Sequence, residues 1–170
     1  TPATESTMLT RQRISIVDSV AGVTRDRVSA PCSANDVWFE LVDTGGFGIA
    51  DQDELGEHVE QQIAYAVRES ALVLFIVDVK AGIVPLDRRV AERLRETDRN
   101  VLLLANKADG VEQDPIAAEF FALGFGEPIA ISALHSRNRH DVLDAITEAL
   151  GPSDARPDEP IMKLAIVGKR

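Results

Sequence analysis

Apolar and polar residues follow one another along this chain in two different patterns. Residues 71–77 are a short, continuous apolar run, which is typical of a parallel strand buried on both faces, and residues 100–105, apolar after the first residue, form a second such strand. Between them, Leu86, Val90 and Leu94 recur at helical spacing, with Arg and Glu on the exposed side. Buried strands that alternate with amphipathic helices predict an α/β fold, a mostly parallel sheet with helices on both faces.

The remaining segments extend this alternation. Near the start of the chain we expect two strands, over residues 26–30 and 37–42, joined by a turn over 33–36, and then a helix over 55–67. Later in the chain we expect a helix over 116–123, a strand over 128–131 and a helix over 141–150. The chain is long enough for one domain with a proper core, and too short for two ordinary ones.

The composition changes abruptly after residue 150. Residues 151–160 contain three prolines and three acidic residues, which predicts an exposed linker. An apolar segment, residues 161–167, follows as a new strand. Small polar residues at the start of the chain predict a disordered tail. The expected organisation is a tail over 1–8, a main domain over 9–150, the linker, and a separate opening strand over 161–170.

Charge and cysteine content narrow the possible functions. The formal net charge of −10 argues against a broad basic face for nucleic acid, although it leaves room for a nucleotide pocket built from backbone N–H groups. The single cysteine, Cys32, rules out an internal disulfide and is expected to be a packing residue in a cytoplasmic protein. The longest apolar run is too short to span a membrane, so we expect no membrane partner.

A first candidate site begins with Asp43, directly after the strand over 37–42. Asp43-Thr44-Gly45-Gly46 places a carboxylate at a strand end, followed by glycines that let the backbone approach a phosphate. In this interpretation Asp43 holds Mg²⁺ through water and the Gly46 N–H faces the terminal phosphate. The alternative is a tight turn with an ordinary capping aspartate.

A second candidate site, Asn106-Lys107-Ala108-Asp109, follows the strand over 100–105. The Asp109 carboxylate can accept guanine N1–H and the exocyclic amine together, and adenine offers neither donor in that place. In this interpretation Asn106 ties neighbouring loops together and the Lys107 stem lies along the base. The alternative is a helix N-cap in a βα loop.

A third loop, Ser132-Ala133-Leu134, follows the strand over 128–131 and would complete the base pocket with a backbone N–H. Each of the three loops follows a strand and precedes a helix. Ligands of open α/β sheets bind at the carboxyl ends of the strands. The shared context therefore favours one nucleotide site over three unrelated turns.

With these motifs the chain resembles the EngA/Der group of TRAFAC-class GTPases, bacterial proteins with two tandem G domains of the Ras-like P-loop NTPase fold. The strings that carry the resemblance are residues 13–17, 22–27, 43–47, 106–109, 124–129 and 132–135. The resemblance implies hydrolysis of GTP to GDP and phosphate with Mg²⁺, a K⁺ ion near the phosphates, and a role in maturation of the large ribosomal subunit. It also implies that Thr24 is the switch I threonine, which binds Mg²⁺ and the γ-phosphate.

By the same resemblance, residues 9–150 are the first G domain, and residues 161–170 are the opening strand of the second, with Gly168 as the first glycine of its phosphate loop. The sequence departs from the family in one respect, because the phosphate loop G-x-x-x-x-G-K-[ST] and the strand before it are nowhere in these 170 residues. We expect either a partial chain spliced near residues 8–9 or a true fragment. A further hypothesis is that residues 161–167 replace the missing strand, in cis or from a neighbouring molecule.

One departure from the Ras pattern also bears on function. Phe47 stands where a Ras-like protein has the glutamine that orients the attacking water, so the water must be oriented by other means. Without a phosphate loop, the alternative function is a non-hydrolysing G-domain relic that serves as an interaction module. An ATPase of the same fold is disfavoured by Asp109.

Overall fold

A computed structural model describes residues 28–43, 67, 70–152 and 163–168 of the chain. These residues contain one six-stranded sheet in the order β1-β2-β6-β3-β4-β5. Its strands are β1 (Val28–Ala34), β2 (Val37–Asp43), β3 (Leu72–Asp78), β4 (Asn100–Asn106), β5 (Ile129–Ala130) and β6 (Lys163–Gly168). Only β1 and β2 pair antiparallel within this sheet, and the other four pairings are parallel. The predicted mostly parallel sheet is confirmed.

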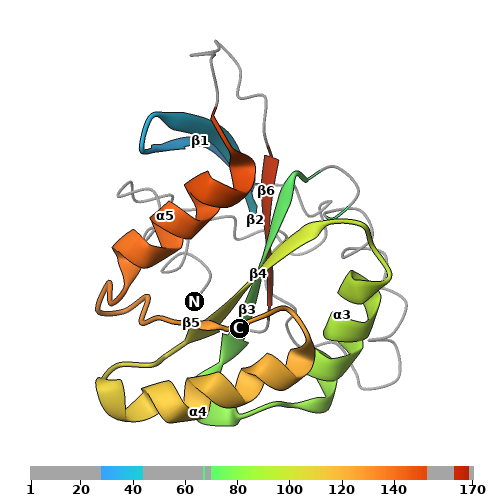
Figure 1. Cartoon of the computed structure of the whole chain (residues 1–170), viewed down its shortest axis with the longest axis vertical. Helices are drawn as coiled ribbons and strands as arrows, with labels where there is room; N and C mark the ends of the chain where they lie inside the picture. Colours follow the sequence, from blue (N-terminus) through green and yellow to red (C-terminus); the bar gives the residue numbers. More distant parts are fainter. Residues whose placement is uncertain (1–27, 44–66, 68–69, 153–162, 169–170) are drawn as a thin grey trace, which may run out of the picture.

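Helices cover both faces of this sheet, as predicted (Figure 1). The α-helices described are α3 (Pro85–Arg95), α4 (Asp114–Ala118) and α5 (Arg139–Leu150), and the short 3-10 helices are η1 (Val79–Ala81), η2 (Val111–Gln113) and η3 (Glu119–Leu123). One core cluster joins α5 to the sheet, and a second cluster on the opposite face joins it to α3, α4 and η3.

Strand β3 shows why the fold needs both layers. Leu72, Leu74 and Ile76 belong to the cluster under α5, whereas Val73 and Phe75 belong to the cluster under α3. Successive side chains of a strand point to opposite faces of the sheet, so a continuous apolar run must be covered twice. No more than 4% of any of these five side chains is exposed, which matches that requirement.

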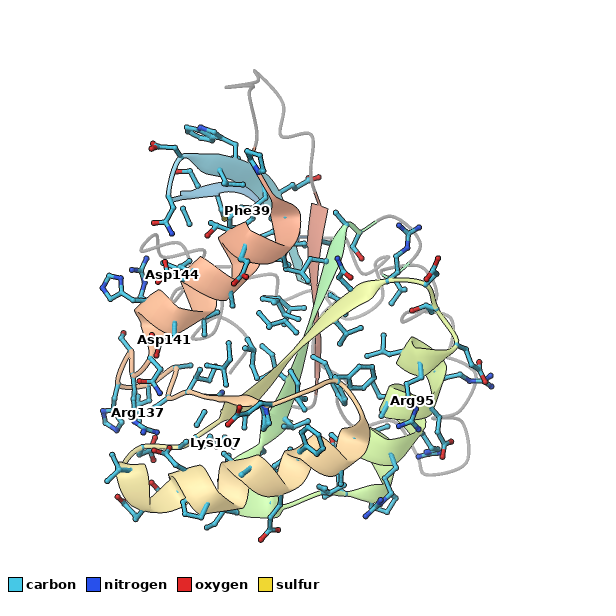
Figure 2. The ribbon with its side chains drawn as sticks, in the orientation of Figure 1. Phe39, Arg95, Lys107, Arg137, Asp141 and Asp144 are labelled. Carbon is cyan, nitrogen blue, oxygen red and sulfur yellow. The ribbon has the colours of Figure 1, made fainter. Side chains whose placement is uncertain are left out.

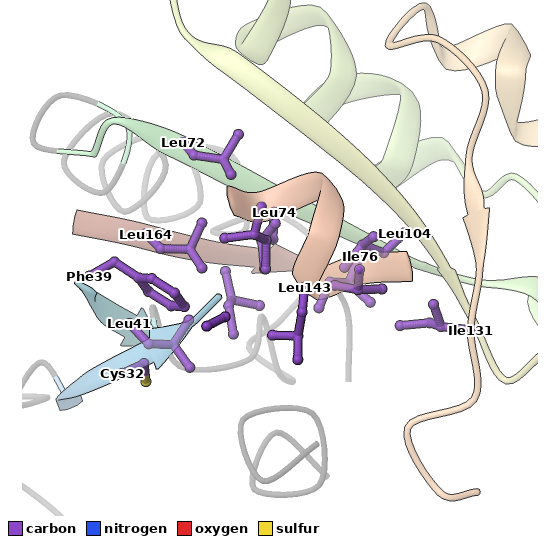
Figure 3. Close-up of a cluster of buried hydrophobic side chains, with 14 of the residues drawn as sticks. Cys32, Phe39, Leu41, Leu72, Leu74, Ile76, Leu104, Ile131, Leu143 and Leu164 are labelled. Carbon is purple, nitrogen blue, oxygen red and sulfur yellow. The ribbon is translucent and has the colours of Figure 1, made fainter. Parts of the chain in front are cut away.

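Strand β6 lies at the centre of the sheet, parallel to β2 on one side and to β3 on the other. Its Leu164 is level with Leu41 of β2 and Leu72 of β3, and the three leucines share one buried cluster (Figure 3). Residues 163–168 thus fill a central position of the sheet in cis, which agrees with one form of the hypothesis that residues 161–167 replace the missing strand. The assignment of this strand to a second domain stays a prediction.

The boundaries of some elements differ from those expected. The β1–β2 turn comprises only Asn35 and Asp36, both at positive φ (46° and 64°), because such a two-residue turn matches the twist of a hairpin. Ser33 and Ala34, expected in the turn, therefore still belong to β1.

The helix expected over residues 116–123 is two elements. It begins earlier, at Asp114, where Pro115 in the first turn needs no N–H partner. After Ala118 it tightens into η3 and ends at Gly124, whose φ of 87° suits glycine. The helix expected over 55–67 lies outside the described residues except for Val67, which is helical and buried. Within the described part of the chain, no helix is long and apolar enough to cross a membrane.

Candidate functional site

The carboxyl ends of β3, β4 and β5 lie next to one another, and the polar loops that follow them build the candidate site. Asn106 is the last residue of β4, and after it the backbone of Lys107 enters the left-handed region at φ 67°. Two backbone bonds link the β4 and β5 segments: the Ala108 N–H donates to the Ile131 carbonyl at 2.9 Å and the Ile131 N–H to the Ala105 carbonyl at 2.8 Å. The loops are therefore fixed to each other before any side chain contributes.

Asn106 adds a side-chain link between the same loops. Its amide oxygen Oδ1 accepts from the Ala133 N–H at 3.0 Å and from the Lys107 N–H at 2.8 Å. The side chain is buried, and a buried polar group is stable only when it has hydrogen-bond partners. Asn106 thus does what the sequence predicted of it, which is to hold neighbouring loops together.

Asp109 presents the only carboxylate of the motif, and both of its oxygens are bound. Oδ1 accepts from the buried Ser132 hydroxyl at 2.7 Å, and Oδ2 accepts from the Lys80 ammonium at 2.6 Å. These two hydrogen bonds, first Lys80 and then Ser132, lower the pKa of Asp109 below its ordinary value. The carboxylate is therefore ionised at neutral pH and can accept hydrogen bonds from a ligand.

Lys107 and Arg137 lie at this same end of the sheet (Figure 2). The Lys107 ammonium pairs with Asp78 at 2.6 Å. Arg137 donates to the Ala108 carbonyl at 3.0 Å and to Asp114 at 2.8 Å, and this pair lowers the pKa of Asp114. Because Arg137 also exchanges two backbone hydrogen bonds with Ser132, it joins the β5 loop to the loop after β4.

Sequence reasoning missed four residues of this network: Asp78, Lys80, Asp114 and Arg137. A signal for Asp78 was present, since it ends the apolar strand β3 just as Asn106 ends β4. Nothing local marks the side chains of Lys80 or Arg137, because Lys80 reaches Asp109 across 29 positions and Arg137 reaches Ala108 across 29 and Asp114 across 23.

The other predicted site residues are partly outside the described chain. Asp43 is the last residue of β2 and is level with Ile166 of the central strand, and Gly168 is the last residue of that strand. Leu134 is 74% exposed at the tip of its loop. Thr24, Thr44, Gly45 and Gly46 lie outside the described residues.

Comparison with known proteins decides the family. Residues 6–107, more than half of the chain, match the family described as 50S ribosome-binding GTPase. The chain belongs to this GTPase family. The resemblance to the EngA/Der group is confirmed by relatives called GTPase Der. The protein from Rhodopirellula baltica is 44% identical over 164 residues, and the one from Thermomicrobium roseum is 43% identical over 169 residues.

The two matches cover nearly all of this chain but only part of each relative. Each includes 95% of this chain but only 36% and 37% of the respective relative, so the chain spans little more than a third of the length of those GTPases. Among solved structures, translation elongation factor SelB from Methanococcus maripaludis, in complex with the GTP analogue GppNHp, aligns with a TM-score of 0.56 at 18% identity. That alignment covers 89% of this chain and 31% of SelB. It supports the G-domain fold.

Proposed function

We propose that this chain is a guanine-nucleotide-binding part of a GTPase that hydrolyses GTP to GDP and phosphate. The observation that carries the proposal is the environment of Asp109: an ionised carboxylate at the carboxyl edge of a parallel sheet, held by Ser132 beside the buried Asn106. A carboxylate in such a place accepts the N1–H and exocyclic amine of guanine, whereas adenine would leave it without donors.

The phosphate end of the site is proposed from the family and from the ends of β2 and β6. An aspartate that ends β2 fits the oxygen ligands preferred by Mg²⁺, which neutralises charge on the phosphates when bound. In this proposal Asp43 holds Mg²⁺ through water, Thr24 binds it directly, and the segment Thr44-Gly45-Gly46 faces the γ-phosphate. Gly168, at the end of β6, begins a phosphate loop.

The biological role is proposed for the whole protein. The family name refers to binding of the 50S ribosomal subunit, and the relatives that match almost all of this chain are called GTPase Der. We therefore infer that the full protein acts in assembly of the large ribosomal subunit in the cytoplasm. A K⁺ ion near the phosphates is part of the same proposal and rests on the resemblance to the EngA/Der group alone. Phe47 offers no group that could orient the attacking water, so in this proposal the water is oriented by other means.

Calorimetric titration of the chain with GTP and with ATP, each with Mg²⁺, tests nucleotide binding. We expect GTP to bind in the micromolar range and ATP far more weakly. Asp109→Ala should remove the preference for GTP. Asp98→Ala is a matched control, since Asp98 is an exposed aspartate just before β4, at the opposite edge of the sheet. Undetectable binding at millimolar GTP would instead favour a G-domain relic that serves as an interaction module.

A further inference from the structure

Two lysine–aspartate ion pairs connect the loop after β3 with the candidate base-binding loop after β4. The Lys80 ammonium lies 2.6 Å from Asp109 Oδ2, and the Lys107 ammonium lies 2.6 Å from Asp78 Oδ2. Each loop thus supplies one lysine and one aspartate, and each residue pairs with the opposite charge of the other loop. The sheet brings the loops together, because Asp78 and Asn106 are register partners on neighbouring strands.

Asp78 determines where both lysines lie. While Oδ2 binds the Lys107 ammonium, Oδ1 accepts from the Lys80 N–H at 2.9 Å and caps the short helix η1. Val79, which lies between Asp78 and Lys80 in the chain, is buried in the core and anchors the same segment. One carboxylate therefore orients the Lys107 side chain and the start of the segment that carries Lys80.

Lys80 in turn completes the support of Asp109. Ser132 binds one oxygen of that carboxylate and Lys80 binds the other, so donors from two different loops fix its plane. An ionised carboxylate has about four lone-pair sites, and two of them stay available for a base. Two parallel N–H donors, such as those of guanine, require a carboxylate held in one plane for both hydrogen bonds to be short and straight.

We propose that Asp78 and Lys80 are positioning residues for guanine recognition, with Lys80 orienting Asp109 and Asp78 orienting Lys107. This inference rests on the proposed nucleotide-binding function. The lysines of both pairs are exposed to solvent, at 57% for Lys80 and 49% for Lys107, and their partners Asp109 and Asp78 are partly exposed, at 29% and 25%. Exposed ion pairs contribute little to folding stability. Lys80 and Asp78 can therefore be substituted without unfolding the chain.

The test is titration of the 170-residue chain and its variants with GDP and with IDP, which lacks the exocyclic amine of guanine. Lys80→Met should weaken GDP binding by about two- to tenfold, the factor that corresponds to one ordinary hydrogen bond. IDP, which makes one hydrogen bond fewer to Asp109, should lose less. The ratio of the two affinities therefore falls in Lys80→Met, and Lys80→Arg should restore most of it, because a guanidinium also donates to a carboxylate.

Asp78→Asn is the second variant. Asparagine keeps an oxygen for the Lys80 N–H but loses the negative charge that holds Lys107. GDP and IDP should therefore weaken by similar factors, with little change in their ratio. Arg93→Met is the control, since it removes an exposed ion pair with Glu96 at 3.2 Å on α3, away from the site. Thermal melting of each variant without nucleotide checks that the fold is intact.

The outcomes distinguish a failure of the proposed function from a failure of this inference. If the wild-type chain binds no guanine nucleotide, the proposed function and this inference fall together. If it binds GDP but Lys80→Met leaves both the affinity and the GDP-to-IDP ratio unchanged, only the inference is wrong. Tighter GDP binding by Lys80→Met would also overturn it, because it would mean that Lys80 competes with the base for Asp109.

Discussion

The central place of β6 predicts a large loss of stability when its buried leucine is shortened. Leu164 is fully buried, level with Leu41 and Leu72 on the strands at either side, and packs in the cluster under α5. Leu164→Ala removes three carbon atoms from this row and leaves a cavity that strands on both sides must close. A strand detached from the sheet would be insensitive to the same change.

The expected size follows from burial. The three missing carbons correspond to about 2.4 kcal/mol of lost transfer free energy, at about 0.8 kcal/mol each. Incomplete closure of the cavity adds to this, so we expect a decrease of about 3 kcal/mol in the free energy of unfolding, within the usual range of about 2–5 kcal/mol for buried leucines. Leu134→Ala is the matched control: Leu134 is 74% exposed, and its truncation should cost less than about 0.5 kcal/mol.

Urea denaturation followed by far-UV circular dichroism measures both variants, and the single tryptophan, Trp38 on β2, provides a second probe by fluorescence. Hydrogen exchange adds an independent measurement, because the amides of β6 should exchange slowly between two parallel neighbours. The reasoning is refuted if Leu164→Ala costs no more than Leu134→Ala, or if the amides of residues 163–168 exchange at the rate of an unstructured peptide.

Three further predictions concern single side chains. Asp109→Asn should shift nucleotide preference from guanine toward xanthine, because the amide can donate a hydrogen bond where the carboxylate only accepted. Competition between GDP and XDP measures this preference, and unchanged guanine selectivity would contradict the role proposed for Asp109. Burial raises the pKa of the Cys32 thiol from 9.0 to about 11, opposed by a smaller effect of a hydrogen bond with the Leu41 backbone. The folded state therefore keeps this proton longer than the unfolded chain, and the stabilisation present below pH 9.0 is lost as the pH rises toward about 11. Urea unfolding across this range should show a smaller pH dependence for Cys32→Ala than for wild type, and equal slopes would be evidence against it. At the start of α3, the Asp87 carboxylate accepts a hydrogen bond from the Val84 N–H at 3.0 Å. Asp87→Ala should therefore destabilise the protein by about 1 kcal/mol, and Asp87→Asn, which keeps an acceptor oxygen, by less. Equal losses of stability in thermal unfolding would show that this hydrogen bond is not the cause.

Much of the sheet can be predicted from local pattern. Strands β3 and β4 lie within one residue of the apolar runs at 71–77 and 100–105. Such runs are informative because a strand covered on both faces needs apolar side chains at every position. The β1–β2 turn is less predictable, since small polar residues suit either a strand end or a turn, and only the backbone conformation of Asn35 and Asp36 separates them.

The loops of the proposed base site could be predicted in part. Asn106, Asp109 and Ser132 follow strand-like segments, and residues that follow parallel strands meet at one edge of a sheet. Their partners Lys80 and Arg137 could not be predicted in the same way. Lysine and arginine are common on every protein surface, so their pairing depends on which loops the fold places side by side.

The sequence by itself determined that this protein alternates buried strands with amphipathic helices, and it placed the residues proposed for guanine recognition after two of those strands. Only the tertiary structure decided the order of the strands, in which β6, the last along the chain, lies between β2 and β3. The physical reason is that hydrophobic pattern specifies how many faces of a strand are buried, whereas its neighbours are chosen by pairing and packing over long sequence distances. The ion pairs that Asp78 and Lys80 make with Lys107 and Asp109 depend on the same placement, because β3 and β4 are adjacent only in the folded sheet.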